Sequence, residues 1–263
     1  MILSRISRAV REQNWFAVVL EFFIVVAGVT LGFQISVFGE RAADRAYERD
    51  LLQRLDAEVV NIENGRRYQQ EWLNRYRSVM LEMRPVIFGV EARDALTAQE
   101  CSVLMESHYV AAPPDTLPAL DELVATGRMQ AIRNSRIRAA ASDFLQKRQS
   151  ARAQFAVNLA NITNLPRAFP GLMRTELIAD PDETQEAGAD REEDGWDRRS
   201  VCDLAAMQSN PDFQTAAAEN IGEFRSILRF NYDFVGLSLS ELHAAIDAEL
   251  GVTHDDEVEA EAE

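Results

Sequence analysis

The sequence predicts an all-α protein in which one N-terminal transmembrane helix continues into a long stalk helix and then an antiparallel helical bundle. Three observations predict this fold class. Residues 15–38 form an unbroken apolar run. Apolar residues recur every three or four positions through most later segments, as on one face of a helix. No segment shows sustained apolar–polar alternation bounded by turn dipeptides, which is the signal of a half-buried strand.

The apolar run, Trp15 to Phe38, contains no Lys, Arg or Asp, and its strongly polar members are Glu21 and Gln34. A helix rises about 1.5 Å per residue, so this run covers roughly 36 Å, more than a hydrocarbon core of about 30 Å. A secretory signal peptide has a shorter apolar core and a small-residue cleavage site. The run leads instead into Gly-Glu-Arg. We therefore expect residues 15–38 to span the lipid bilayer.

The flanks of this run set the expected orientation. Residues 1–14 carry Arg5, Arg8 and Arg11, which predicts a cytoplasmic tail under the positive-inside rule. The other flank also carries arginines, but they alternate with acids, and large domains cross membranes largely regardless of charge. We expect a single-pass protein in which residues 39–250 form a helical domain outside the cytoplasm.

The first long helix after the run extends from Glu40 to Arg84, because this stretch has no proline and one glycine, Gly65. Pro85 is expected to stop the helix. The stripe that this helix would bury consists of Leu51, Leu55, Ile62, Trp72, Tyr76, Val79 and Met83.

Shorter signals mark the later helices. Thr97 and Glu100 form a capping-box pattern, and Gly127 is placed to close a second short helix. Asn134 is expected to cap a long helix that Pro166 ends, with Arg148 and Asn158 interrupting its apolar stripe. Two further helices are expected to begin at Asn210-Pro211 and, through a second cap, at residues 238–241.

The net charge of −16 is local. Residues 180–194 and 247–263 together carry 15 of these net negative charges. The segment of about 177–196 is poor in apolar residues and is expected to be a mobile acidic loop, and residues 251–263 a disordered acidic tail. No basic stripe is available to neutralise phosphates, so nucleic acid is not an expected partner.

The chain has two cysteines, Cys101 and Cys202, and neither lies in a CxxC pair. In an oxidising compartment the even count favours a disulfide between them. The alternative is two buried free thiols, and the sequence leaves both open.

No recognisable metal, cofactor or catalytic site is expected. His108, His243 and His254 fall on different elements, so no histidine pair has ligand spacing. Asp190, Glu192 and Asp194 resemble the start of a calcium-binding loop, but Val201 occupies the position of its bidentate glutamate. Phosphate-loop, dinucleotide, zinc-protease and serine-hydrolase motifs are missing from the sequence.

The most informative polar pattern lies inside the expected span. Gly28 and Gly32 form GxxxG, and Ser36 continues it as a small residue. At 100° per residue, Glu21 lies within about 40° of both glycines on the helical wheel. We expect this face to contact another membrane helix, from a second copy or a different membrane protein, which would shield Glu21 from lipid.

Two segments resemble a bacterial family of uncharacterised single-span membrane proteins, classed as a domain of unknown function. One is residues 25–36, VVAGVTLGFQIS, and the other is residues 120–134, LDELVATGRMQAIRN, similar to the family's helix–glycine–turn segment. The resemblance implies the topology and the helical fold. With it, the expected location is a bacterial inner membrane with the large domain in the periplasm. It brings no catalytic residues.

Three classes of function follow. The first is a membrane-tethered scaffold or accessory subunit that acts through protein contacts. The second is an extracytoplasmic ligand-binding or sensory bundle, which would need a partner because 14 cytoplasmic residues cannot house an output domain. The third, an enzyme, would need a convergent acid–base cluster that the sequence does not display, so we expect no enzyme.

The glycine face gives a testable prediction. Gly28→Leu and Gly32→Leu should weaken association of the span more than Glu21→Gln does, because an interhelical hydrogen bond in a membrane is worth only about 0.6–2 kcal/mol. Cysteine crosslinking along residues 17–36 in native membranes would measure this. Gln34→Leu, on the opposite face, is the control. Crosslinks that peak at position 34 would contradict the predicted face.

Overall fold

The computed structural model describes residues 15–179, 196–252 and 254, and the side chains of residues 15–19, 21, 179, 196 and 197 lie outside this description. The expected cytoplasmic tail, residues 180–195 with the calcium-like pattern, and nearly all of the acidic tail therefore lie outside the described residues. The chain divides into two compact units, Met1–Leu52 and Gln53–Glu263.

The protein is mostly helical, as predicted. Its helices and strands, in chain order, are α2 (Trp15–Ile87), α3 (Ala98–Met105), α4 (Pro118–Ala125), η1 (Met129–Ala131), α5 (Ser135–Asn161), α6 (Leu165–Ala168), β1 (Met173–Ala179), β2 (Trp196–Cys202), α7 (Leu204–Gln208), α8 (Pro211–Ile227), η2 (Leu228–Phe234) and α9 (Val235–Leu250).

Helix α2 is one uninterrupted helix, and its N-terminal part is apolar and exposed. A window within it has a mean hydropathy of 2.0 and is not buried by any described part of the chain. Pro85 does not stop the helix. It lies inside α2, which ends at Ile87. It also passes through Gly65, where a Cβ would lie 3.3 Å from the ring of Pro114. Gly65 therefore permits close approach of the 113–114 segment and is not a break.

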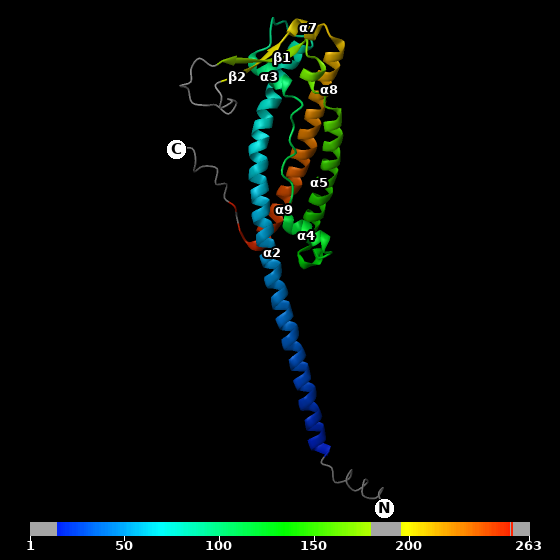
Figure 1. The fold of residues 1–263 in the computed structure, drawn as a ribbon. Coiled ribbons are helices and arrows are strands. Elements are labelled where there is room, and N and C mark those ends of the chain that lie inside the picture. Colours follow the sequence, from blue (N-terminus) through cyan, green and yellow to red (C-terminus); the bar gives the residue numbers. More distant parts are fainter. Residues whose placement is uncertain (1–14, 180–195, 253, 255–263) are drawn as a thin grey trace, which may run out of the picture. The chain divides into compact units, whose positions relative to one another are not determined.

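In the second unit, α5 packs against α8 and α9, and these helices lie side by side in Figure 1. Buried side chains from α2, α3 and α8 form the main hydrophobic cluster, with single residues from α6, β1 and α7 and two from η2. Its members include Leu73, Met80, Met83, Leu104, Met173, Phe213, Phe224 and Leu228. Trp72, expected in the stripe, is instead exposed and stacks on Tyr76, with ring centroids 4.7 Å apart.

The predicted helix ends that depend on local chemistry are confirmed. Thr97 and Glu100 form a full capping box at α3. Asn134 accepts a hydrogen bond from the Arg136 amide at the start of α5. Gly127, just after α4, has φ +67°, the left-handed conformation that glycine adopts without strain.

Two expectations about secondary structure are wrong. Strands β1 and β2 pair antiparallel, from Met173↔Cys202 to Ala179↔Trp196, so residues 177–179 and 196, expected within a mobile loop, belong to strands. No new cap begins at residue 238, because α8, the π-helix η2 and α9 follow one another without interruption. The buried Ser238 hydroxyl instead donates to the carbonyl of Val235 within α9.

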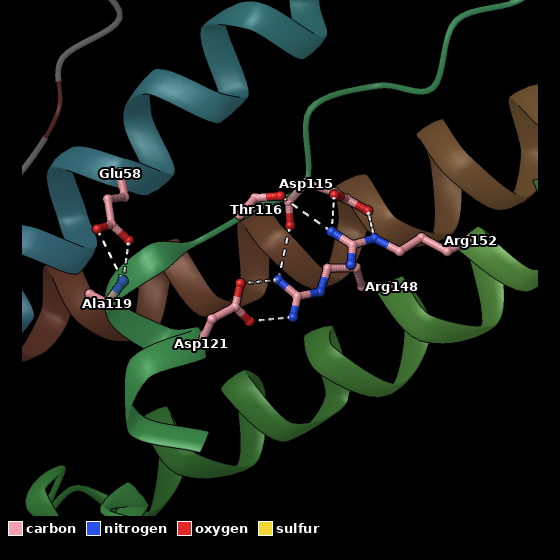
Figure 2. A network of polar contacts seen from close by, with 7 residues as sticks. All are labelled: Glu58, Asp115, Thr116, Ala119, Asp121, Arg148 and Arg152. Atoms are coloured by element: carbon pink, nitrogen blue, oxygen red, sulfur yellow. Dashed lines mark hydrogen bonds and ion pairs between the residues drawn. The ribbon is translucent and has the colours of Figure 1, made fainter. Parts of the chain in front are cut away.

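A polar network ties α4 and the extended segment before it to α2 and α5 (Figure 2). Arg148 on α5 donates to Asp121, at 2.5 and 3.3 Å, and Arg152 donates to both carboxylate oxygens of Asp115. Glu58 on α2 accepts from the amide of Ala119, near the N-terminus of α4. The buried Arg148, which interrupts the predicted apolar stripe, therefore has acidic and backbone partners.

Of the two alternatives for the cysteines, a disulfide or two free thiols, the structure contains the disulfide. Cys101 on α3 and Cys202 at the end of β2 are bonded, with Cα atoms 5.9 Å apart, and they close a loop of 101 residues in sequence separation. The bond attaches the β1–β2 hairpin to α3.

Removal of this bond should destabilise the protein. Cys101→Ala combined with Cys202→Ala should lower the free energy of unfolding by about 2–5 kcal/mol, because the unfolded chain regains the entropy of a long loop. Urea unfolding of the full chain in detergent micelles, followed by circular dichroism, would measure it. The wild type with reductant should match the double variant. Equal midpoints for oxidised and reduced wild type would contradict the prediction.

Candidate functional site

The second unit has a groove of about 1210 Å³ lined by residues of α2, η2 and α9. Its lining is largely polar and charged. The α2 side of the groove includes Glu63, Arg66 and Arg67, and the α9 side includes Ser240, His243 and Asp247. His254, beyond the end of α9, also lines it.

Four side chains with metal-ligating chemistry converge, and three of them, His243, Asp247 and His254, line this groove. They are Asp56 on α2, His243 and Asp247 on α9, and His254, and their ligand atoms all lie within 4.8 Å of one another. His243 and Asp247 are one helical turn apart and so share a face of α9. Asp56 is not part of any metal-binding sequence motif, because it lies far from the other three residues along the chain.

The distances within the cluster are short and similar. The Nε2 atom of His243 lies 3.6 Å from Oδ1 of Asp56 and 3.5 Å from Oδ1 of Asp247. The Nε2 atom of His254 lies 3.1 Å and 3.5 Å from the same two oxygens. The two imidazole rings face each other, with centroids 5.0 Å apart.

Glu63 orients the ring of His243. Glu63 lies about two helical turns after Asp56, on the same face of α2. Its Oε2 atom is 2.8 Å from Nδ1 of His243. A carboxylate accepts hydrogen bonds, so the proton of a neutral His243 ring sits on Nδ1 and the lone pair on Nε2 points at the two aspartates.

Two atoms of the cluster are buried without a hydrogen bond to any group in the described part of the chain: Nε2 of His243 and Oδ1 of Asp247. Burying a polar atom without a partner costs free energy. Burial raises the pKa of Asp247; the Asp56 carboxylate raises it further, whereas His243 and His254 lower it. The hydrogen bond to Asp56 raises the pKa of His254.

A glycine brings His254 into the cluster. Gly251 follows the last residue of α9 with φ +69°, and its amide and that of Val252 both donate to the carbonyl of Asp247. This left-handed turn ends the helix and redirects the chain. His254 then lies 3.1 Å from Asp56 on α2, although its side chain remains 41% exposed.

Arg66 holds α2 against the helix that carries the site. Its guanidinium is buried and donates to the carbonyls of Pro114, Asn231 and Tyr232. The last two belong to the π-helix η2, a helix type that is rare and recurs at functional sites. Burial lowers the pKa of Arg66, and the guanidinium also lies 5.4 Å from the centroid of the Tyr232 ring.

The residues that the sequence singled out lie elsewhere. Gly28, Gly32 and Ser36 lie in the first unit and are exposed, and a Cβ added at either glycine would meet no described atom within 4 Å. The side chain of Glu21 is outside the described residues. His243 and His254, which have no ligand spacing in the sequence, are brought together by the fold, with ring centroids 5.0 Å apart. His108 is separate, with Nδ1 3.0 Å from the carbonyl of Met105.

The available sequence signal for this cluster was weak. A histidine and an aspartate four residues apart on a helix, followed by a helix-ending glycine and a second histidine, form a plausible local group. The α2 half, Asp56 and Glu63, is identified only by the tertiary fold.

No protein-family model, curated protein or solved structure matches this chain. The resemblance to a family of single-span membrane proteins therefore stays a prediction, and the site is interpreted from its own geometry.

The role of Arg66 is testable. Arg66→Met keeps the side-chain volume but removes the donors, so buried carbonyls lose their partner and the free energy of unfolding should fall by about 1–3 kcal/mol. Urea unfolding of the full chain would measure this. Arg67→Met, an exposed neighbour on α2, is the control and should change stability by less than about 0.5 kcal/mol. Equal effects of the two variants would contradict a special role for Arg66.

Proposed function

We propose that this chain is a membrane-tethered binding protein whose helical domain, an antiparallel bundle, captures a small ligand outside the cytoplasm. The observation that carries the proposal is the groove between α2 and α9, where Nε2 of His243 and Oδ1 of Asp247 are buried without a hydrogen bond to any described part of the chain. Ligand sites are concave and have a few convergent polar groups, and unsatisfied buried atoms of this kind are uncommon in folded proteins.

The proposed tether is residues 15–38. Its large apolar side chains are exposed, including Phe22, Phe23 and Phe33. A continuous apolar surface of this kind is not stable in water, and lipid would cover it. The arginines of residues 1–14 favour a cytoplasmic N-terminus. The Cys101–Cys202 disulfide supports an oxidising compartment for the large domain, such as a periplasm.

A second candidate function is a scaffold or accessory subunit that acts through protein contacts. The exposed glycines Gly28 and Gly32 favour it, because a partner helix could approach their backbone closely. The two functions are separated by extraction in mild detergent and native mass spectrometry. A small bound species on the single chain supports the binding role, and a stoichiometric protein partner without one supports the scaffold.

The topology gives a prediction. Protease added to spheroplasts should remove the C-terminal domain and leave a membrane-embedded N-terminal fragment, because residues 39–250 are expected outside. Immunoblots with antibodies against the domain would show it, with a cytoplasmic protein as the control for lysis. Protection in intact spheroplasts and digestion only after lysis would reverse the topology.

A further inference from the structure

We propose that Asp56, His243, Asp247 and His254 form a binding site for one divalent transition-metal ion, with Zn²⁺ as the best-fitting ion. The inference rests on the ligand-binding role proposed above and names the chemical class of the ligand. Three independent properties of the cluster support it: its dimensions, its donor types and its charge.

The dimensions fit a tetrahedral ion. Zinc binds histidine nitrogen and carboxylate oxygen at about 2.0–2.2 Å, which puts neighbouring ligand atoms of a tetrahedron about 3.3–3.6 Å apart. The four nitrogen–oxygen distances in the cluster are 3.6, 3.5, 3.1 and 3.5 Å, and all of its ligand atoms lie within 4.8 Å of one another. Side-chain adjustments that bring the more distant pairs together would let an ion at the centre reach all four atoms.

The donor types select among ions. Two imidazole nitrogens suit Zn²⁺ and its transition-metal neighbours, whereas Ca²⁺ and Mg²⁺ require oxygen ligands. The lone pair of His243 already points into the cluster, because Glu63 accepts the proton of the opposite ring nitrogen. Metal-bound histidines commonly have such a carboxylate partner, which fixes the ring and raises its basicity.

The charge also matches. Asp56 and Asp247 supply two carboxylates, and a divalent cation bound between them would neutralise their two negative charges. It would also give a partner to both buried atoms that have none in the described chain, Nε2 of His243 and Oδ1 of Asp247. Arg66 and Arg67 line the same groove but are not among the four ligands.

The test uses the full chain in detergent, without a polyhistidine tag, after treatment with a chelator and its removal. Zn²⁺ titrated against a competing dye should bind one ion per chain and raise the thermal unfolding temperature. His243→Ala and His254→Ala should each abolish this stoichiometric binding. His108→Ala, which removes an imidazole outside the cluster, is the matched control and should bind like the wild type.

Glu63→Gln separates a positioning role from a structural one. It should weaken Zn²⁺ binding by about 10–100-fold, the usual effect of removing the partner of a ligating histidine. The unfolding temperature of the metal-free protein should change little. Co²⁺ substitution gives a second readout, because tetrahedral Co²⁺ absorbs visible light far more strongly than octahedral Co²⁺. An intense spectrum that His254→Ala weakens supports the site.

Three results would overturn the metal site: no Zn²⁺ binding by the folded wild type, equal binding by the wild type and both histidine variants, or preference for Ca²⁺ or Mg²⁺ over Zn²⁺. These outcomes are distinct from failure of the proposed function. A periplasmic domain that carries an organic ligand but no Zn²⁺ overturns only the metal site. A domain that binds Zn²⁺ but is protected inside spheroplasts overturns only the extracytoplasmic role.

Discussion

The buried guanidinium of Arg66 links three backbone segments, and the geometry of the groove depends on it. It donates to Pro114 on the extended segment and to Asn231 and Tyr232 on η2. A guanidinium is planar and carries its donors in a fixed fork, so it sets the distance between the segments that it joins. Helix α9 begins directly after η2, at Val235. The position of η2 against α2 therefore determines where the ligating face of α9 lies.

The contacts along α2 and the C-terminal helix have a consistent direction. Arg66 meets Tyr232, Glu63 meets His243, and Asp56 meets Asp247, so residue numbers fall along α2 as they rise along α9. The two helices thus run antiparallel, and Asp56 and Glu63 of α2 both meet one face of α9. The Asp56 carboxylate raises the pKa of Asp247, because two like charges close together repel each other.

The sequence predicted features that depend on neighbours along the chain, and missed those that depend on distant ones. Caps at Thr97, Asn134 and Asn210 were predictable because a side chain satisfies amides two or three residues away. Strands β1 and β2 were missed because their pairing joins segments on either side of residues 180–195, and neither segment shows regular apolar–polar alternation.

Buried polar residues show the same limit. Arg148 and Asn158 appeared to interrupt the apolar stripe of α5, but both are buried. Arg148 binds Asp121 from α4, which no local pattern indicates. The candidate site is the extreme case. Asp56 and His254 are at opposite ends of the chain, 198 residues apart, and meet only because α2 and α9 pack together and Gly251 turns the chain back.

The two candidate functions can be parts of one mechanism. Helix α2 runs without interruption from Trp15 to Ile87, so the proposed membrane span and the ligating residue Asp56 belong to the same helix. An ion at the cluster would bond that helix to α9 and to the segment after it, and so would change how firmly α2 is held in the domain. A change in α2 could be passed to a partner within the membrane, and the exposed faces of Gly28 and Gly32 are where a partner helix could approach most closely.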